Sequence, residues 1–485
     1  MKKRLLLLLL VILLLLPAIQ TGAAVTVYGW GRGWYDQLGP AGEEKTFHPV
    51  RIPLPADVIA VKSGSSFGLA LDAAGRVWGW GRGQMGATGR VPPPANPEAN
   101  FPQPAVVPGL PIITQIAAGE EVALALAADG TVWVWGEDTF GIHGYGNQMQ
   151  PQLPPHRVPG LNNIVRIAMS SAHGLALRAD GTVWAWGNNA FGECGLDPQV
   201  NDHRQAGHIT PRQMQNLANI VAIATGENTS YALRVDGVLF AWGRDISAAT
   251  QKQYEPVAVS GSVKVAQIST APWTGYIKDV NGGQWAIGDH GGGCLNATAT
   301  CTRTTWLERM AKLPPVTILT GNYSVALAVR PDGSLLVWGD NYYGGLGQPY
   351  TGTARSPIPL PGITGVFAAD AGYYTPMVAT GLKCHAQLSA DGRELQVIKA
   401  NILGRAYYLK FVYQPAGGQV RYQLVDFKPV PAGACGSEAI LLADGGGYLL
   451  HLPWVEWQGQ YFWVNFDVRV EGGQVFVVYR NAGQL

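Results

Sequence analysis

"DGTVWAWGNNAFGECG", residues 180–195, is the stretch of sequence that decides the fold. It begins with an Asp-Gly pair, continues through an apolar run with two tryptophans, and ends in a glycine-rich segment. Asp-Gly favours tight hairpin turns because both residues tolerate a positive φ. The segment therefore predicts a strand that follows a tight turn and leads into a loop.

The same segment recurs along the chain. Its second aromatic position falls at residues 30, 80, 135, 186, 242, 287 (here Ile) and 338. The spacings between these positions are 50, 55, 51, 56, 45 and 51 residues. A second apolar element, loosely Ala-x-Gly-x-x-x-x-Ala-Leu, stands upstream of the last six copies, as in residues 167–177. Seven units of about fifty residues indicate a repeat architecture made of short strand pairs.

The two ends of the array predict how it closes. The first copy, residues 25–31, has only the aromatic element, and the last, residues 366–378, has only the upstream element. Joined, these halves complete one unit, and a ring closed in this way leaves no exposed sheet edge. We therefore predict an all-β fold with a seven-bladed β-propeller closed by pairing of the N- and C-terminal repeat halves.

The pattern changes after Gly381. Strand-like runs alternate with hairpin signals such as Asp391-Gly392 and Asp444-Gly445, which predicts a small antiparallel β-sandwich or barrel. An aromatic stretch in this part comprises Trp454, Trp457, Tyr461, Phe462 and Trp463. We interpret it as the core of a small domain, with a carbohydrate- or cell-surface-binding platform as the alternative. The predicted division is a signal peptide in residues 1–23, the propeller in residues 24–381, and a β-rich domain of no recognised family in residues 382–485.

The first 23 residues have the pattern of a secretory signal peptide. Lys2, Lys3 and Arg4 precede an unbroken apolar run of twelve residues, and small residues follow up to Ala23. This run is too short to span a bilayer comfortably, so we favour cleavage over a retained anchor. We expect an exported protein, periplasmic, cell-surface or secreted, with no stable membrane insertion after removal of the signal.

Charge and cysteine content restrict the function further. Removing the three basic residues changes the formal net charge from +1 to −2, which argues against nucleic acid as a partner. There is no C-x-x-C and the histidines are scattered, so we expect no metal and no cofactor. In an exported chain, Cys294 could pair with Cys301 and Cys384 with Cys435, which would leave Cys194 over.

The repeat consensus resembles a known family. It combines G-x-x-H-x-x-A-L with D-G-x-V-W-x-W-G-x-N and a G-x-x-G loop, most cleanly in residues 170–195, although Ser170 stands where the first Gly belongs. Over residues 25–380 this resembles the regulator of chromosome condensation repeat family. The resemblance implies a seven-bladed β-propeller. The eukaryotic namesake exchanges nucleotide on a small GTPase and docks on chromatin, but the export signal and the absence of a basic tail favour a secreted bacterial-type member.

A secreted bacterial propeller of this kind inhibits β-lactamases, and the resemblance implies partner binding through aromatic residues on one face of the ring. The matching positions after the glycine of the upstream element are Phe67, Trp273, Tyr323, Tyr373 and Tyr374. Those after the Trp-Gly are Trp34, Tyr35, Phe140, Phe191, Tyr342 and Tyr343. Aromatic side chains are frequent interface hot spots. For Phe140, Phe191 and Tyr343, we favour the alternative that they fill gaps between blades.

Sequence matches to catalytic motifs are weak. Residues 64–68 match G-x-S-x-G with Ser66 as the nucleophile, and residues 290–293 read His-Gly-Gly-Gly. The nucleophile motif requires a helix after it, whereas another strand-like run follows here. We therefore expect no catalytic residues and rank a hydrolase below the other readings. The adjacent Glu120 and Glu121 could contribute to a cation site or a partner contact, but a solvated loop is favoured. The expected function is binding of a protein, or another macromolecule, by a non-catalytic propeller.

Overall fold

A computed structural model describes most of residues 25–484. The segments left out are 56–57, 94, 139, 146–152, 172, 198–208, 245–252, 289–303, 311–312, 350–351, 382–385, 389–392, 403–404, 415–419, 430–438, 445–446, 458–459 and 472–473. The predicted signal peptide and four of the five cysteines, Cys294, Cys301, Cys384 and Cys435, lie outside the described residues. The described part of the chain contains no helix long and apolar enough to cross a membrane.

The opening segment forms the turn and the third strand of a four-stranded blade. The blade consists of β11 (Ile164–Met169), β12 (His173–Arg178), β13 (Val183–Gly187) and β14 (Ile209–Gln213), each antiparallel to the next. A tight turn joins β12 to β13, as predicted, but only its glycine adopts a positive φ: Gly181 has a φ of 82°, and the Asp180 carboxylate instead accepts from the Thr182 amide at 3.0 Å.

Six further sheets have the same size, which confirms the seven-bladed propeller. Blade 1 consists of β3 (Val58–Ser63), β4 (Phe67–Asp72), β5 (Val77–Gly81) and β6 (Phe101–Val106). Blade 2 consists of β7 (Ile113–Ala118), β8 (Val122–Ala127), β9 (Val132–Gly136) and β10 (Leu153–Arg157). Blade 3 is β11 to β14. Blade 4 consists of β15 (Ile220–Thr225), β16 (Thr229–Arg234), β17 (Leu239–Gly243) and β18 (Gln253–Ala258). Blade 5 consists of β19 (Val265–Thr270), β20 (Thr274–Asp279), β21 (Gln284–Gly288) and β22 (Thr304–Arg309). Blade 6 consists of β23 (Ile318–Gly321), β24 (Val325–Val329), β25 (Leu335–Asp340) and β26 (Thr353–Leu360).

Blade 7 is built from both ends of the array, as predicted. Its order is β27 (Val366–Asp370), β28 (Met377–Thr380), β1 (Thr26–Arg32) and β2 (Lys45–Ile52). In the closing pair, Val27 faces Ala379 and Gly29 faces Met377. An ion pair of 2.6 Å between Lys62 of blade 1 and Asp370 of blade 7 joins the two blades beside this closure.

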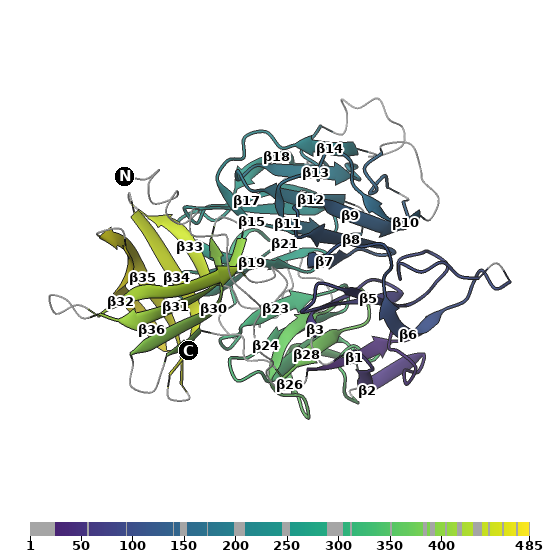
Figure 1. Cartoon of the computed structure of the whole chain (residues 1–485). Helices are drawn as coiled ribbons and strands as arrows, with labels where there is room; N and C mark the ends of the chain where they lie inside the picture. Colours follow the sequence, from purple (N-terminus) through teal and green to yellow (C-terminus); the bar gives the residue numbers. More distant parts are fainter. Residues whose placement is uncertain are drawn as a thin grey trace.

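The first strands of the seven blades surround a central channel. β3, β7, β11, β15, β19, β23 and β27 contact one another in this order around the ring (Figure 1). Residues of all seven line a hollow of about 420 Å³. Because strands alternate in direction, the loop after the first strand and the loop after the Trp-Gly lie at the same end of each blade. We call this end the loop face and the end with the Asp-Gly turns the turn face.

A buried tryptophan packs against the preceding blade in every blade except blade 5, which has Ile287 at this position. Trp30, Trp80, Trp135, Trp186, Trp242 and Trp338 are all 0% exposed. Five indole nitrogens donate to loop carbonyl oxygens of the preceding blade: those of Trp30 to Gly345, Trp80 to Gln37, Trp135 to Ala87, Trp186 to Ile142 and Trp242 to Glu193, at 2.7–2.8 Å. For Trp338 the corresponding loop of blade 5 lies within 289–303, outside the described residues. The second tryptophan of the motif is therefore part of the packing between blades.

The C-terminal part forms one curled sheet. Its strands are β29 (Ala386–Leu388), β30 (Glu394–Ile402), β31 (Arg405–Tyr413), β32 (Arg421–Pro429), β33 (Ala439–Asp444), β34 (Gly447–Trp457), β35 (Gln460–Glu471) and β36 (Gln474–Gln484). Their order is β29-β30-β31-β32-β36-β35-β34-β33, and the ends meet because β29 also pairs with β34 and β33 with β30. These two closing contacts are parallel, because the short β29 and β33 share the place between β30 and β34. The aromatic side chains predicted as a core or platform, Trp454, Trp457, Tyr461, Phe462 and Trp463, lie outside the described part.

This C-terminal domain contacts the turn face of blade 5. The Asn465 side-chain amide donates to the carbonyl oxygen of Val280, in the turn between β20 and β21, at 3.1 Å. Leu449 is buried in the same cluster as Ala266 and Val280. Figure 1 shows the domain (yellow) beside the ring, next to β19 and β21.

Candidate functional site: an aromatic and acidic loop face

The two loops at the loop face of each blade are held together by backbone contacts. The Arg82 amide donates to the Ser66 carbonyl at 3.0 Å, and the Glu137 amide donates to the Glu121 carbonyl at 2.9 Å. The approach is close: Gly136 has a φ of +101°, and a Cβ there would lie 2.5 Å from the Glu121 carbonyl oxygen. Only glycine fits such a position. The glycines at the same position in five other blades, Gly31, Gly81, Gly243, Gly288 and Gly339, approach the neighbouring loop backbone equally closely.

Aromatic side chains from blades 5, 6 and 7 form a continuous cluster on this face, which we call the aromatic arc. Tyr343 lies 5.8 Å from Trp34 and 5.3 Å from Tyr374, centroid to centroid. Tyr323 lies 6.1 Å from Tyr374 and 5.0 Å from Trp273. Tyr342 lies 4.7 Å from Tyr343, and Tyr373 lies 5.5 Å from Tyr323, so both rings belong to the same cluster. Seven of the eleven predicted residues are thus brought together, with Tyr342 65% and Trp34 42% exposed.

Two cations of the chain stack on the arc. The Arg32 guanidinium lies 4.1 Å from the Trp34 ring centroid, and Lys45 Nζ lies 4.2 Å from that of Tyr342. Tyr35 is placed at the edge of the arc, between Arg32 at 5.7 Å and Arg82 at 4.7 Å. Such stacking favours defined ring orientations and contributes about 0.5–1 kcal/mol for each exposed pair. The arc is therefore held in place before any partner binds.

Carboxylates gather on the loops of blades 2 and 4, which we call the acidic arc. Glu120 and Glu227 each follow the glycine after the first strand, and Glu137 lies in the third loop of blade 2. Burial raises the pKa of Glu120, and the nearby charges of Glu137 and Glu227 raise it further, against the opposing effect of Arg32. Because Glu137 and Glu227 both act on Glu120 as like charges, this side of the face carries several neighbouring carboxylates and favours a cationic partner group.

The two arcs meet over the channel. Glu227 of blade 4 lies close enough to Tyr323 of blade 6 to act on its phenol electrostatically, and Ser171 of blade 3 lies beside Tyr373 of blade 7. Burial is the main cause that raises the pKa of both phenols. Glu227 and Tyr373 also line the channel. The centre of the loop face is therefore a polar and aromatic surface to which blades from opposite sides of the ring contribute.

Three predicted contact residues do not belong to the arc. Phe67 is 0% exposed and faces Gly81 in the register that His173 occupies in blade 3, so its side chain is not available to a partner. The alignment of the loops by sequence placed it wrongly, because it is the first strand residue and not a loop residue. Phe140 is half-buried, and Phe191 is half-buried beneath Arg244 at 4.7 Å.

Sequence reasoning missed four charged residues of the face: Arg32, Lys45, Glu137 and Glu227. Glu227 had a usable signal, because it occupies the same repeat position as Glu120. Lys45 had none, since β2 has no counterpart in the repeat motif and its position beside Tyr342 follows from ring closure.

The suspected nucleophile has the surroundings of a structural serine. Ser66 is 0% exposed and donates to the Glu121 carboxylate at 2.5 Å. Strand β4 follows it, where a nucleophile elbow requires a helix. Burial raises the pKa of Glu121 to about 7. The motif at residues 290–293 lies outside the described residues.

Cysteine and metal chemistry offer little in the described part. Cys194 is a free, buried thiol whose Sγ lies 3.1 Å from the Asn188 carbonyl oxygen, and burial raises its pKa. Within the same residues, no group of three or more His, Cys, Asp or Glu side chains is placed to hold a metal ion.

Seven four-stranded blades, indole fastening and a variable loop face define a seven-bladed β-propeller built from repeats. The chain belongs to the RCC1-like domain family, which matches residues 26–378. It is 29% identical over 289 residues to the guanine nucleotide exchange factor SRM1 of Saccharomyces cerevisiae, covering 51% of this chain and 57% of that protein. It is 31% identical over 239 residues to the human E3 ubiquitin-protein ligase HERC2, of which it covers 4%. The chain thus spans about half of one relative and a small part of the other.

Solved structures agree on the fold. Yeast RCC1 (Prp20) bound to Kap60 superposes with a TM-score of 0.65 at 23% identity, covering 74% of this chain and 90% of that one. Human WBSCR16 gives a TM-score of 0.62 at 20% identity, covering 74% and 99%. At these identities the likeness establishes the propeller fold.

Proposed function

We propose that this protein is an exported, non-catalytic propeller that binds a protein partner through the loop face. The observation that carries the proposal is the aromatic arc, seven rings from three blades in mutual contact. Clustered, partly exposed aromatic side chains supply large contact area at a low cost in side-chain entropy, which is typical of interface hot spots. Relatives of this fold support the reading: yeast RCC1 was solved bound to Kap60, and the binding of Prp20p to Gsp1p and histones has been described.

The charge of the face specifies the partner further. The acidic arc borders the aromatic arc, so the contacting loops of the partner should carry Lys or Arg. These side chains can pair with Glu120 and Glu227 while their stems lie on the aromatic rings. Complementary charge of this kind raises the association rate more than the final affinity.

Export is proposed from the N-terminal sequence. The basic start, the twelve-residue apolar run and the small residues before Ala23 favour cleavage by a signal peptidase. N-terminal sequencing of the protein recovered outside the cytoplasm should begin close to Ala24. A mature protein that still begins at Met1 would contradict this part of the proposal.

The binding proposal is tested by capture from the exported fraction. Wild-type protein, a Tyr342→Ala/Tyr343→Ala variant and a Tyr479→Ala variant are used as baits. Tyr479 is a matched control because it is 45% exposed but lies in the C-terminal domain. We expect a partner that wild type and Tyr479→Ala retain and that the double variant loses. A partner retained equally by all three baits would show that the loop face is not the binding surface.

A further inference from the structure

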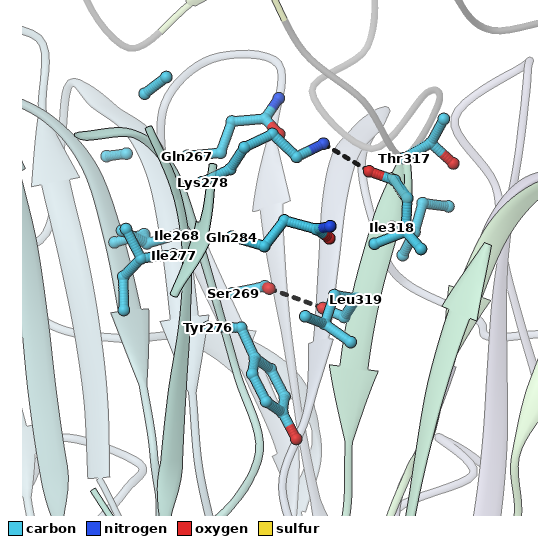
Figure 2. A pocket seen from close by; sticks show the side chains of 13 residues that line it. Gln267, Ile268, Ser269, Tyr276, Ile277, Lys278, Gln284, Thr317, Ile318 and Leu319 are labelled. Carbon is cyan, nitrogen blue, oxygen red and sulfur yellow. Dashed lines mark hydrogen bonds between the residues drawn. The ribbon is translucent and has the colours of Figure 1, made fainter. Parts of the chain in front are cut away.

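One buried histidine of the ring lacks the hydrogen bonds that polar side chains make elsewhere between the blades. In the pocket between blades 5 and 6, the Ser269 hydroxyl donates to the Leu319 carbonyl oxygen at 2.6 Å (Figure 2). In blade 3, His173 is 0% exposed, and its two ring nitrogens lie 2.8 and 2.9 Å from serine hydroxyl oxygens. His143 of blade 2 is also 0% exposed, but neither of its ring nitrogens has a hydrogen-bond partner among the described residues.

His143 packs against a second histidine, His156 of β10. Their ring centroids are 4.8 Å apart, and the ring planes are inclined by 64°. His156 Nδ1 lies 3.0 Å from the Pro154 carbonyl oxygen, and because a carbonyl oxygen can only accept, Nδ1 carries the proton. The lone pair of His156 is therefore on Nε2, which is buried and has no hydrogen-bond partner in the described part of the chain. Tyr145 stacks on the same ring at 5.8 Å.

Other blades fill the same two positions with hydrocarbon. His143 directly follows the residue that accepts the indole hydrogen bond of the next blade, and His156 lies in the outer strand opposite Val134. At these two positions blade 6 has Leu346 and Ile358, and blade 7 has Leu38 and Val50. Leu346 and Leu38 are both 0% exposed, as His143 is. Aliphatic side chains are thus sufficient for packing here, and packing alone does not account for two histidines.

The two imidazoles present lone pairs that the described protein groups do not match. Burial lowers the pKa of His143 to about 3, against the opposing effect of the Gly136 backbone, so its ring is neutral near pH 7. A buried acceptor without a donor costs about 1–3 kcal/mol. Two imidazoles bound to one tetrahedral zinc ion have ring centroids about 5 Å apart, close to the distance found here. The bond from His156 Nδ1 to a backbone carbonyl is the contact that metal-binding histidines typically make with their other nitrogen.

From these contacts we propose a transition-metal site in blade 2, in which His143 and His156 bind an ion of the zinc or copper type. Imidazole nitrogen is a preferred ligand of both ions. Among the described residues the pair belongs to no group of three or more His, Cys, Asp or Glu side chains, so water would fill the remaining coordination positions. Neither histidine belongs to the aromatic arc or the acidic arc, so the site is independent of the proposed partner surface.

The test is calorimetric titration of the full chain, without an affinity tag, with Zn²⁺ and with Cu²⁺ and Mg²⁺ as further probes. The key variant is His143→Leu/His156→Val, which takes both residues from blade 7. Because it removes unmatched polar atoms and uses side chains that the same fold already packs, it should fold at least as stably as wild type. The control is His48→Ala, which removes an exposed histidine of β2.

We expect wild type to bind one Zn²⁺ with a Kd of about 10 μM, to bind Cu²⁺ more tightly, and to show no binding of Mg²⁺. The double variant should bind Zn²⁺ at least tenfold more weakly, and His48→Ala should bind it as wild type does. Equal binding by wild type and the double variant, or no binding of Zn²⁺ by wild type up to about 1 mM, overturns the inference. A loss in His48→Ala as large as in the double variant also overturns it, since scattered surface histidines would then hold the ion.

If the double variant does not fold, the single variant His156→Val decides the question. It changes only the half-buried histidine of the outer strand and leaves the interior position as it is. It should show the same tenfold loss of Zn²⁺ affinity, because one of the two ligands is gone. Unchanged Zn²⁺ affinity in this variant would overturn the inference.

Discussion

The tryptophans inside the blades and the aromatic residues of the loop face come from the same repeat but are determined differently. Trp186 is 0% exposed and its indole donates to blade 2, whereas Tyr342, four residues past its own Trp, is 65% exposed. The first kind of residue recurs because every blade presents the same groove to its neighbour. The second kind differs between blades because it lies in the loop after the glycine, where the side chains no longer pack between blades. The strand that carries the tryptophan is therefore the same in most blades, and the side chains that differ between blades lie in the loop that follows it.

Removing an interior tryptophan should give the largest effect. Trp186→Ala leaves a cavity between blades 2 and 3 and leaves the Ile142 carbonyl without its donor, so we expect a loss of about 3–5 kcal/mol in the free energy of unfolding. Thermal or urea denaturation measures it. A loss below about 1 kcal/mol would show that the blades do not depend on the indole contacts.

The converse change on the loop face should spare the fold. For Tyr342→Ala/Tyr343→Ala we expect partner affinity to fall by about 2–4 kcal/mol, as for interface hot spots. The single variant Tyr342→Ala, whose ring is 65% exposed, should keep the unfolding free energy within about 0.5 kcal/mol of wild type. Titration against the captured partner and denaturation of the free protein give the two numbers. Strong destabilisation without a specific loss of binding would assign these rings to the core.

Glu121 lies between the blade interior and the loop face, and its ionisation should make the stability of the fold depend on pH. Its pKa is about 7 in the folded protein against an ordinary value of 4.5, mainly through burial. Between these values the folded protein retains a proton that the unfolded chain has released, so the free energy of unfolding falls as the pH rises. The expected decrease is on the order of 2 kcal/mol.

The matched variant for this prediction is Glu121→Gln, which keeps an acceptor for Ser66 and cannot ionise. Its unfolding free energy should change less than that of wild type between pH 4.5 and 7. Parallel pH curves for the two proteins would remove Glu121 from the explanation.

The smallest effect is expected at Trp184, the other tryptophan of β13, which also contains Trp186. Trp184 is half-buried and stacks on Arg178 at 4.2 Å. Trp184→Ala should cost about 1 kcal/mol, since it loses one cation–π contact and part of an apolar contact. If it costs as much as Trp186→Ala, the distinction between the two tryptophans of the motif is wrong.

Local patterns were sufficient to predict the blades. The turn at Gly181 and the strand after it depend on residues within about ten positions of one another. The burial of Trp186 depends on the preceding blade, which the regular spacing of the repeats supplies. Closure through Val27 and Ala379 was also predictable, because two incomplete repeat units imply each other. What each blade contributes to the loop face was less certain. Phe67 was assigned to the loop, but it is the first residue of β4 and its side chain is fully buried.

Contacts across the ring could not be derived from the sequence. Tyr373 meets Ser171, and Tyr323 meets Glu227, only because seven blades close with one particular curvature. No local spacing encodes that curvature.

The seam in blade 7 also sets the order of events during synthesis. The Thr380 hydroxyl donates to the Thr26 carbonyl, across 354 positions of the sequence. β1 leaves the ribosome first among the strands of the ring but has no partner on its inner edge until β28 has been made. Such long-range pairing is slow to form and leaves a strand edge open in the meantime. A chain that is exported before folding would bring both halves of the seam to the same compartment before either has to pair.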